Sequence, residues 1–290
     1  MDLPFQLLNV FAIPGQPFTG NALAVFTHCE GLAEETMRAI ARQMNLAEVT
    51  FVQRATDPHA DADVRIFTVA VEMPFAGHPT LGTAQVVHAM QGSLRETVRL
   101  KMKAGLVAVT RVGASEWELR AAKKPRWSAL PSGKEGIARV LGLTRDEIQG
   151  EPTWVDTGTE QLIVPLRDAE SVRRVKVDPV AMGELAYSEI AGEAVVYVIG
   201  PRADGDLEAR FFTLSQGSVL EDPATGSACA NYGGYRLLQG ETLRPYEAVI
   251  HQGSQVGRPS RLKLTLSSTG DVLVRGAVVP VGQGTLHIEM

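Results

Sequence analysis

Cysteine is scarce in this chain of 290 residues, which contains only Cys29 and Cys229. The two lie far apart and form no CxxC pair, which excludes a disulfide framework and a CxxC metal or redox motif. This usage fits a reducing compartment, and we take the cytoplasm as the expected location.

The net charge and the lack of long hydrophobic runs indicate what kind of molecule the protein binds. The net charge is -5, the pI is near 5.7, and no segment is dense in Lys or Arg, which argues against nucleic acid and against an anionic membrane surface. The N-terminus lacks the features of a signal peptide, and no apolar run approaches the length of a membrane span. We therefore expect a small-molecule partner.

The sequence also lacks the common cofactor and nucleophile motifs. It has no GxGxxG and no GxxxxGK[ST] loop, so a nucleotide site has no support. Its six histidines show neither HxxxH nor HxH spacing, and no GxSxG turn marks a serine hydrolase. We therefore expect an activity that needs no metal and no cofactor.

The most informative stretch that is present reads EDPATGSACA, residues 221–230. Pro223 cannot continue a preceding helix, whereas Thr225 and Gly226 suit the start of a helix over 225–238. The free N–H groups of a first helical turn favour a bound anion. We expect Asp222 to lie at the edge of that anion and Ser227 to donate to an oxyanion rather than to attack.

A similar turn with proline and glycine before a predicted helix occurs earlier in the chain. The segment 72–78, EMPFAGH, shares Glu, Pro and Gly with 221–227 at identical spacing, and Arg65-Ile66-Phe67-Thr68 matches Arg210-Phe211-Phe212-Thr213. The first match has an offset of 149 residues and the second an offset of 145, which predicts an internal duplication with a four-residue insertion in the second copy.

The pattern of elements predicts an α+β protein. Helices are expected at 32–44, 78–90, 134–142, 178–187 and 225–238, and short strands at 3–13, 21–26, 48–52, 63–71, 95–101, 104–112, 115–120, 152–156, 160–165, 195–199, 207–214, 246–251, 261–267, 271–276 and 283–288. We expect two similar domains, 1–125 and 126–290, each a curved, mostly antiparallel sheet wrapped around a central helix. The polar segment 123–127 is read as their linker, and the last strand could pack back on the first domain.

Four side chains remain as candidates for chemistry. Glu48 stands where a predicted helix gives way to a strand, while Asp222, His78 and Ser227 lie at the two glycine turns. Two carboxylates with oxyanion donors between them suit a proton shift next to a carboxylate or carbonyl group. This interpretation requires the two helix starts to meet in one cleft. The alternatives are a surface glutamate for Glu48, a helix cap for Asp222 and a structural histidine for His78.

Several ordered motifs resemble the phenazine-biosynthesis PhzF-like family. They are NLAEVTFV at 45–52, PFAGHPTLGTA at 74–84, EDPATGSA at 221–228, and QG at 252–253 with GRPSR at 257–261. The resemblance spans nearly the whole chain. It implies a diaminopimelate-epimerase-like fold, a cofactor-independent isomerase and a homodimer.

Matched residue by residue, the resemblance places the catalytic groups of the family on Glu48, His78, Asp222 and Ser227. Gly77, Thr225 and Gly226 are then expected to bind the substrate. It implies isomerisation of the dihydro-hydroxyanthranilate type, used in phenazine biosynthesis, on a small carboxylate. The sequence departs at Ala47-Glu48-Val49, where the family more often has Ser-Glu-Thr, which leaves the acid in place.

The sequence is also consistent with two other functions. An amino-acid epimerase or racemase could use the same cleft, although the two cysteines do not match the two turns, which disfavours a two-thiol racemase. A non-catalytic metabolite-binding protein could keep the same fold, although binding alone does not require both acids.

Overall fold

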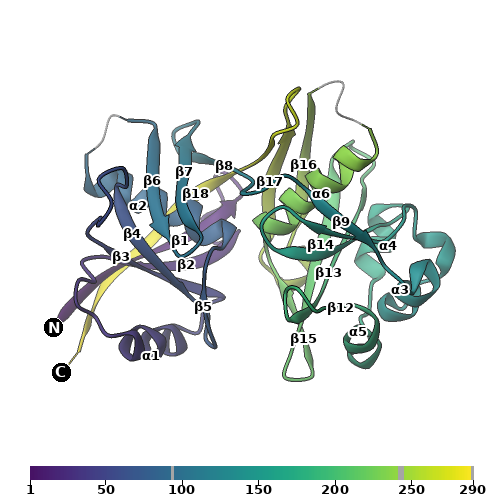
Figure 1. Cartoon of the computed structure of the whole chain (residues 1–290), viewed down its shortest axis with the longest axis horizontal. Coiled ribbons are helices and arrows are strands. Elements are labelled where there is room, and N and C mark those ends of the chain that lie inside the picture. Colours follow the sequence, from purple (N-terminus) through teal and green to yellow (C-terminus); the bar gives the residue numbers. More distant parts are fainter. Residues whose placement is uncertain (93–94, 241–244, 289–290) are drawn as a thin grey trace. The chain divides into compact units, whose positions relative to one another are not determined.

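The computed structural model of the chain describes residues 1–92, 95–240 and 245–288 (Figure 1). The chain divides into two compact units, Met1–Leu119 with Arg275–Met290 (unit 1) and Arg120–Val274 (unit 2). The division therefore falls at Leu119 and Arg120 rather than after residue 125, and it assigns the end of the chain to unit 1.

Unit 1 is a sheet with two helices. Its strands are β1 (Asp2–Ala12), β2 (Asn21–Phe26), β3 (Glu48–Gln53), β4 (Ala62–Phe67), β5 (Glu72–Met73), β6 (Thr97–Met102), β7 (Gly105–Arg111) and β8 (Glu116–Arg120), and its helices are α1 (Glu34–Met44) and α2 (Gly77–Met90). The end of β18 (Val272–His287) pairs antiparallel with β1, from Ala277 opposite Ala12 to His287 opposite Asp2.

Unit 2 has a similar sheet and additional helices. Its strands are β9 (Arg126–Ala129), β10 (Thr153–Asp156), β11 (Glu160–Pro165), β12 (Tyr187–Ser188), β13 (Glu193–Pro201), β14 (Leu207–Ser215), β15 (Ser218–Asp222), β16 (Tyr246–Gln252) and β17 (Ser260–Leu266). Its α-helices are α3 (Gly133–Leu141), α4 (Ala169–Arg174), α5 (Pro179–Leu185) and α6 (Gly226–Leu238), with short 3₁₀ turns at Arg145–Glu147 and Ser254–Val256.

The two units share one order of strand pairing, which confirms the predicted duplication. In unit 1, β1–β2, β3–β4, β4–β5 and β6–β7 pair antiparallel, while β2–β3 and β4–β6 are parallel. In unit 2, β10–β11, β13–β14, β14–β15 and β16–β17 are antiparallel, while β11–β13 and β14–β16 are parallel. The predicted match of 65–90 with 210–238 as strand, turn and central helix is therefore correct.

Each unit buries its central helix against its own sheet. α2 packs on β1, β2, β3 and β6, and α6 packs on β10, β11 and β17. Both helices are buried on nearly all sides, as expected for helices enclosed by a sheet. Small residues permit this contact: a Cβ on Gly82 would lie 2.4 Å from Leu23 Cδ2, and one on Gly233 would lie 2.7 Å from Val272 Cγ1.

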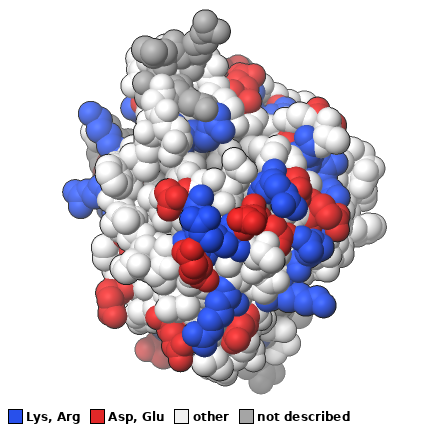
Figure 2. All heavy atoms as spheres, turned by 90° about the vertical axis from the view of Figure 1, so that its right-hand side faces the viewer, with Lys and Arg blue, Asp and Glu red and all other residues white. Residues whose placement is uncertain are grey.

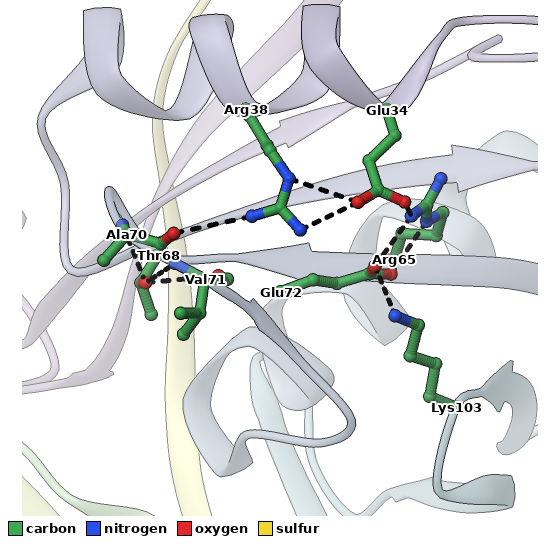
Figure 3. A network of polar contacts seen from close by, with 8 residues as sticks. All are labelled: Glu34, Arg38, Arg65, Thr68, Ala70, Val71, Glu72 and Lys103. Carbon is green, nitrogen blue, oxygen red and sulfur yellow. Dashed lines mark hydrogen bonds and ion pairs between the residues drawn. The ribbon is translucent and has the colours of Figure 1, made fainter.

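An arginine–glutamate pair closes the hairpin that leads to each central helix. In unit 1, Arg65 donates from Nε to Glu72 Oε1 and from Nη2 to Oε2, both at 2.7 Å, and its guanidinium carbon lies 5.1 Å from the centre of the Phe67 ring. Figure 3 shows this pair together with Glu34, Arg38 and Lys103, which extend the network.

Unit 2 repeats this arrangement. Arg210 donates to Glu221 Oε1 at 3.1 Å and to Oε2 at 2.7 Å, and its guanidinium carbon lies 4.7 Å from the centre of the Phe212 ring. Phe212 faces Glu221 across the ladder just as Phe67 faces Glu72 in unit 1. The inserted residues lengthen the β14–β15 hairpin, which explains the change of offset between the two sequence matches.

Three expectations from the sequence need correction. Residues 126 and 127, read as linker, belong to β9, which pairs with β10. The strands expected at 271–276 and 283–288 are one strand, β18, whose glycines and Pro280 look like breaks in the sequence. The short helix α4 was not expected. It begins at Asp168, whose side chain accepts a hydrogen bond from the N–H of Ser171.

Charges of both signs alternate over the face of unit 2 formed by α3, α4 and α5 (Figure 2). Exposed ion pairs of unit 2 include Arg139 of α3 with Glu184 of α5, and Glu135 of α3 with Arg145 of the following 3₁₀ turn. Such pairs each stabilise a protein by about 0–1 kcal/mol because water screens them.

The buried pair of unit 2 should contribute far more to stability. Arg210 and Glu221 are only 12% and 10% exposed, and Arg210 also donates to the carbonyl oxygen of Val175 at 2.9 Å. Arg210→Met keeps most of the volume and leaves Glu221 without its partner, so we expect a loss of about 2–4 kcal/mol in the free energy of unfolding, measured with urea. The matched Arg145→Met should cost less than about 1 kcal/mol. Equal effects of the two substitutions would contradict this assignment.

Candidate active site

Glu48 and His78 lie side by side in unit 1. Glu48 is the first residue of β3, His78 is the second residue of α2, and Nε2 of His78 is 3.5 Å from Oε2 of Glu48. The side chain of His78 is 6% exposed and that of Glu48 is 18% exposed. The structure thus brings together two of the four predicted catalytic residues and gives the carboxylate limited access to solvent.

Burial keeps the ring of His78 neutral. It lowers the pKa of His78 to about 3, and a hydrogen bond with the backbone of Ala22 only partly opposes this effect. Within the described residues, Nε2 is buried and has no hydrogen-bond partner. The neutral ring can therefore offer this nitrogen to a ligand or to the neighbouring carboxylate.

Hydrogen bonds and aromatic packing fix β3 against α2. The hydroxyls of Thr50 and Thr83 are buried and lie 2.8 Å apart, which joins the strand to the helix. Phe51, on the other face of β3, stacks on Phe26 at 5.3 Å and meets the edge of Phe67 at 5.6 Å. Alternation along the strand places Glu48 on the same side as Thr50, toward the helix.

Both central helices begin without a side-chain cap. The N-cap residues are Ala76 in α2 and Thr225 in α6, neither of which makes a side-chain capping hydrogen bond, and neither helix has an acidic residue in its first turn. The predicted binding residues Gly77 and Gly226 are the first residues of these helices. Their N–H groups are suited to a carboxylate or an oxyanion.

Asp222 is held by a short polar network in unit 2. Gln252 is buried, and its Nε2 donates to the backbone oxygen of Asp222 at 2.8 Å and to Thr225 Oγ1 at 3.0 Å. Thr225 Oγ1 in turn donates to Asp222 Oδ2 at 2.5 Å. Thr225 therefore orients the carboxylate of Asp222 rather than capping α6.

The glycine that follows Gln252 permits this contact. Gly253 has a φ of +79°, and a Cβ there would lie 2.4 Å from the oxygen of Pro223 and 2.3 Å from that of Arg258. No side chain fits between the two backbones. This close approach is the physical reason for the glycine of the QG segment at 252–253.

Ser227 is oriented by a residue that sequence reasoning missed. Gln161 Nε2 donates to Ser227 Oγ at 3.0 Å, and Asn231 Nδ2 donates to Gln161 Oε1 at 2.8 Å. Both amides are buried. Because Gln161 lies far from Ser227 in sequence, no local pattern could have shown the contact.

Each unit carries its acid at a different position of the shared scaffold. Val49 faces Phe67 in unit 1 as Val196 faces Phe212 in unit 2, so the position of Glu48 corresponds to that of Val195. Asp222 of unit 2 corresponds in the same way to Met73 of unit 1, because Asp222 follows Glu221 and Met73 follows Glu72. The two copies have therefore diverged in their chemistry while keeping one fold.

The chain matches known proteins over nearly its full length. The family described as "Phenazine biosynthesis-like protein" (PhzC-PhzF) matches residues 8–284. The chain belongs to this family.

Individual members of the family agree in sequence and in fold. An uncharacterised isomerase of Pasteurella multocida is 35% identical over 98% of this chain and 94% of its own length. The trans-2,3-dihydro-3-hydroxyanthranilate isomerase of Pseudomonas aeruginosa is 30% identical over 98% of this chain and 97% of its own. A PhzF-family protein of Bacillus anthracis has a crystal structure that superposes with a TM-score of 0.85 at 20% identity, covering 99% of this chain and 100% of its own.

These matches confirm the predicted PhzF-like family, the diaminopimelate-epimerase-like fold and the classification as an isomerase. The homodimer, the cytoplasmic location and the shared cleft stay predictions.

In the described ranges, no helix is long and apolar enough to span a membrane. Within the same ranges, no group of three or more His, Cys, Asp or Glu side chains lies close enough together to bind a metal ion.

Neither cysteine of this PhzF-like protein is suited to act as a thiolate. Both are buried, and burial raises the pKa of Cys29 to about 12 and raises the pKa of Cys229 as well. A thiol with such a pKa stays protonated near neutral pH. The acid/base groups of this family member are therefore to be sought among its carboxylates.

The buried ring of His78 predicts a pH dependence of stability. The unfolded chain binds a proton on this residue below about pH 6.5, whereas its lowered pKa keeps the native state unprotonated until about pH 3. The stabilisation is thus complete above the unfolded pKa and is lost as the pH falls, by about 1.4 kcal/mol per pH unit. In urea unfolding between pH 6.5 and pH 4, the free energy of unfolding of the native protein should fall more steeply with decreasing pH than that of His78→Asn, by about 1.4 kcal/mol per pH unit.

The exposed His59 offers the matched control, since its ring is in solvent in both states. His59→Asn should unfold with the same pH dependence as the native protein. Parallel pH profiles for the native protein and His78→Asn would show that folding does not lower the pKa of His78.

Proposed function

We propose that this chain is a cofactor-independent isomerase that moves a proton between carbon atoms of a small carboxylate of the trans-2,3-dihydro-3-hydroxyanthranilate type. The observation that carries the proposal is the position of Glu48, 3.5 Å from a buried imidazole and at the start of a strand packed on α2. Curated relatives named for this isomerisation, one of them 30% identical, support the substrate class.

Glu48 is the group to which we assign the proton transfer. Its carboxylate removes a proton from a substrate carbon, and the electron pair of that C–H bond enters the adjacent conjugated system. The carboxylic acid then returns the proton to another carbon, so the reaction consumes and releases nothing. No redox partner is needed.

His78 acts beside Glu48 as a neutral group. Burial lowers its pKa to about 3, so near neutral pH it offers one N–H and one lone pair rather than a positive charge. We assign it the task of orienting the carboxylate and the substrate by hydrogen bonding.

The groups of unit 2 stabilise the substrate and its intermediate in this proposal. Asp222 is oriented by Thr225, and Ser227 is placed at the second position of α6 with a free first turn. The N–H groups of Gly226 and of Gly77 in unit 1 suit the substrate carboxylate and a developing oxyanion.

Replacement of Glu48 tests the assignment directly. Glu48→Gln keeps the size of the side chain and removes the base, so turnover of trans-2,3-dihydro-3-hydroxyanthranilate should fall by about 10²–10⁴ while binding is largely kept. Reaction in D₂O followed by NMR should place deuterium at the receiving carbon in the native protein. Asp222→Asn should also slow turnover.

Glu35→Gln is the control for this experiment, because Glu35 lies exposed on α1. It should retain the turnover of the native protein. Full activity of Glu48→Gln would remove Glu48 from the mechanism, and an inactive native protein would reject this substrate class.

Independence from metals and cofactors makes a further prediction. The purified protein should carry no stoichiometric transition metal in elemental analysis and no flavin or pyridoxal absorbance. Its turnover should not change after dialysis against EDTA, because the proton shift uses only side chains and backbone N–H groups. One tightly bound metal per chain together with loss of turnover in EDTA would contradict the proposal.

A further inference from the structure

A chain of buried hydrogen bonds connects the β10–β11 turn with Ser227. Asn231 Oδ1 accepts from the N–H of Thr157 at 2.8 Å, and Asn231 Nδ2 donates to the carbonyl oxygen of Thr159 at 2.8 Å. Asn231 Nδ2 also donates to Gln161 Oε1 at 2.8 Å, and Gln161 Nε2 donates to Ser227 Oγ at 3.0 Å. Asn231 is 0% exposed and Gln161 is 4% exposed.

Two backbone groups determine which atom of each side-chain amide donates and which accepts along this series of hydrogen bonds. A backbone N–H can only donate and a carbonyl oxygen can only accept. The N–H of Thr157 therefore requires the oxygen of the Asn231 amide, and the carbonyl of Thr159 requires its nitrogen. The second N–H of that nitrogen then requires the oxygen of Gln161, which leaves the NH₂ group of Gln161 facing Ser227. Neither amide can be flipped without placing donors against donors.

The orientation of the Gln161 amide determines the hydrogen-bonding role of the Ser227 hydroxyl. A serine hydroxyl has one proton and two acceptor sites. In the part of the chain that the structure describes, Gln161 is its one hydrogen-bond partner, and Gln161 is a donor. The proton of Ser227 is therefore not used by the described residues and is available to a ligand at the start of α6.

We propose that Gln161 and Asn231 are positioning residues that hold Ser227 as a hydrogen-bond donor toward an oxyanion of the substrate. This inference rests on the proposed function, in which Ser227 stabilises the substrate or its intermediate. Gln161 and Asn231 act through Ser227 and need no contact with the substrate.

Among the described residues, unit 1 lacks the corresponding chain, which supports a functional reason for it. Counting from Gly77 and Gly226, the position of Asn231 in α6 corresponds to Gly82 in α2. A Cβ on Gly82 would already lie 2.4 Å from Leu23 Cδ2, so an asparagine there would have to displace this buried side chain. The fold is thus stable without the buried amides, and they occur only in the unit whose helix carries the serine.

The substitution Gln161→Glu tests the direction of the hydrogen bond with almost no change in shape. The introduced carboxylate accepts instead of donating when it is ionised, so it draws the proton of Ser227 away from the substrate. We expect kcat for trans-2,3-dihydro-3-hydroxyanthranilate to fall roughly 100- to 1,000-fold at pH 8, as for the loss of one oxyanion donor. The loss should shrink as the pH is lowered, because the protonated carboxyl group donates again. A loss that stays constant with pH would overturn the proposal.

A double-mutant cycle separates this effect from a structural one. Ser227→Ala should slow turnover, and adding Gln161→Glu to it should cause less than about a threefold further loss, because the two substitutions remove the same interaction. Independent, multiplicative losses would overturn the proposal. The control is Gln85→Glu, since Gln85 is a half-buried amide that accepts from Trp117 and should still accept after substitution.

A measurement without substrate distinguishes failure of this inference from failure of the proposed function. In the Gln161→Glu protein, ¹³C NMR should show that adding Ser227→Ala raises the pKa of the carboxyl group introduced at position 161, because its ionised form loses a donor. An unchanged pKa would reject the proposed link between the two residues. A raised pKa in a protein whose Ser227→Ala variant is fully active would keep the link and reject the catalytic role of Ser227.

Discussion

The start of each central helix depends on a bidentate arginine–glutamate pair that spans a β-hairpin. Because a strand has a side-chain period of two, a slip of one residue would turn the whole hairpin over. The fork of Arg65 on Glu72, or of Arg210 on Glu221, fits only one register, and the neighbouring phenylalanine ring covers the guanidinium. In unit 2 the residue after Glu221 is Asp222, so this pair also sets the position of the acid to which we assign a role in the proposed mechanism.

The two units share one scaffold and differ at positions that the proposed mechanism uses. Glu48 stands where unit 2 has Val195, and Asn231 stands where unit 1 has Gly82. A scaffold that folds with valine or glycine at these positions does not need glutamate or asparagine for stability. Burying such polar groups costs free energy unless they are hydrogen-bonded, which explains why the amide chain of unit 2 is complete.

Sequence reasoning recovered the parts of the molecule that local patterns encode. Helical spacing, caps and glycine turns placed α1, α2 and α6 nearly to the residue, including the end of α1 at Met44. It failed for β9 and β18, because pairing with a distant strand overrides the breaks that proline and glycine suggest. It also missed Gln161, whose importance arises only when β11 is packed against α6.

Charge neutrality at His78 is the condition under which Glu48 can work as a base. A cation 3.5 Å from a carboxylate would stabilise the ionised form and weaken its hold on a proton taken from carbon. The enclosure of the ring by the sheet of unit 1 removes that cation, since burial lowers the pKa of His78 to about 3. The same packing that makes α2 a core helix therefore keeps the ring beside Glu48 neutral, so the stability of unit 1 and the reactivity that we propose for Glu48 have one physical origin.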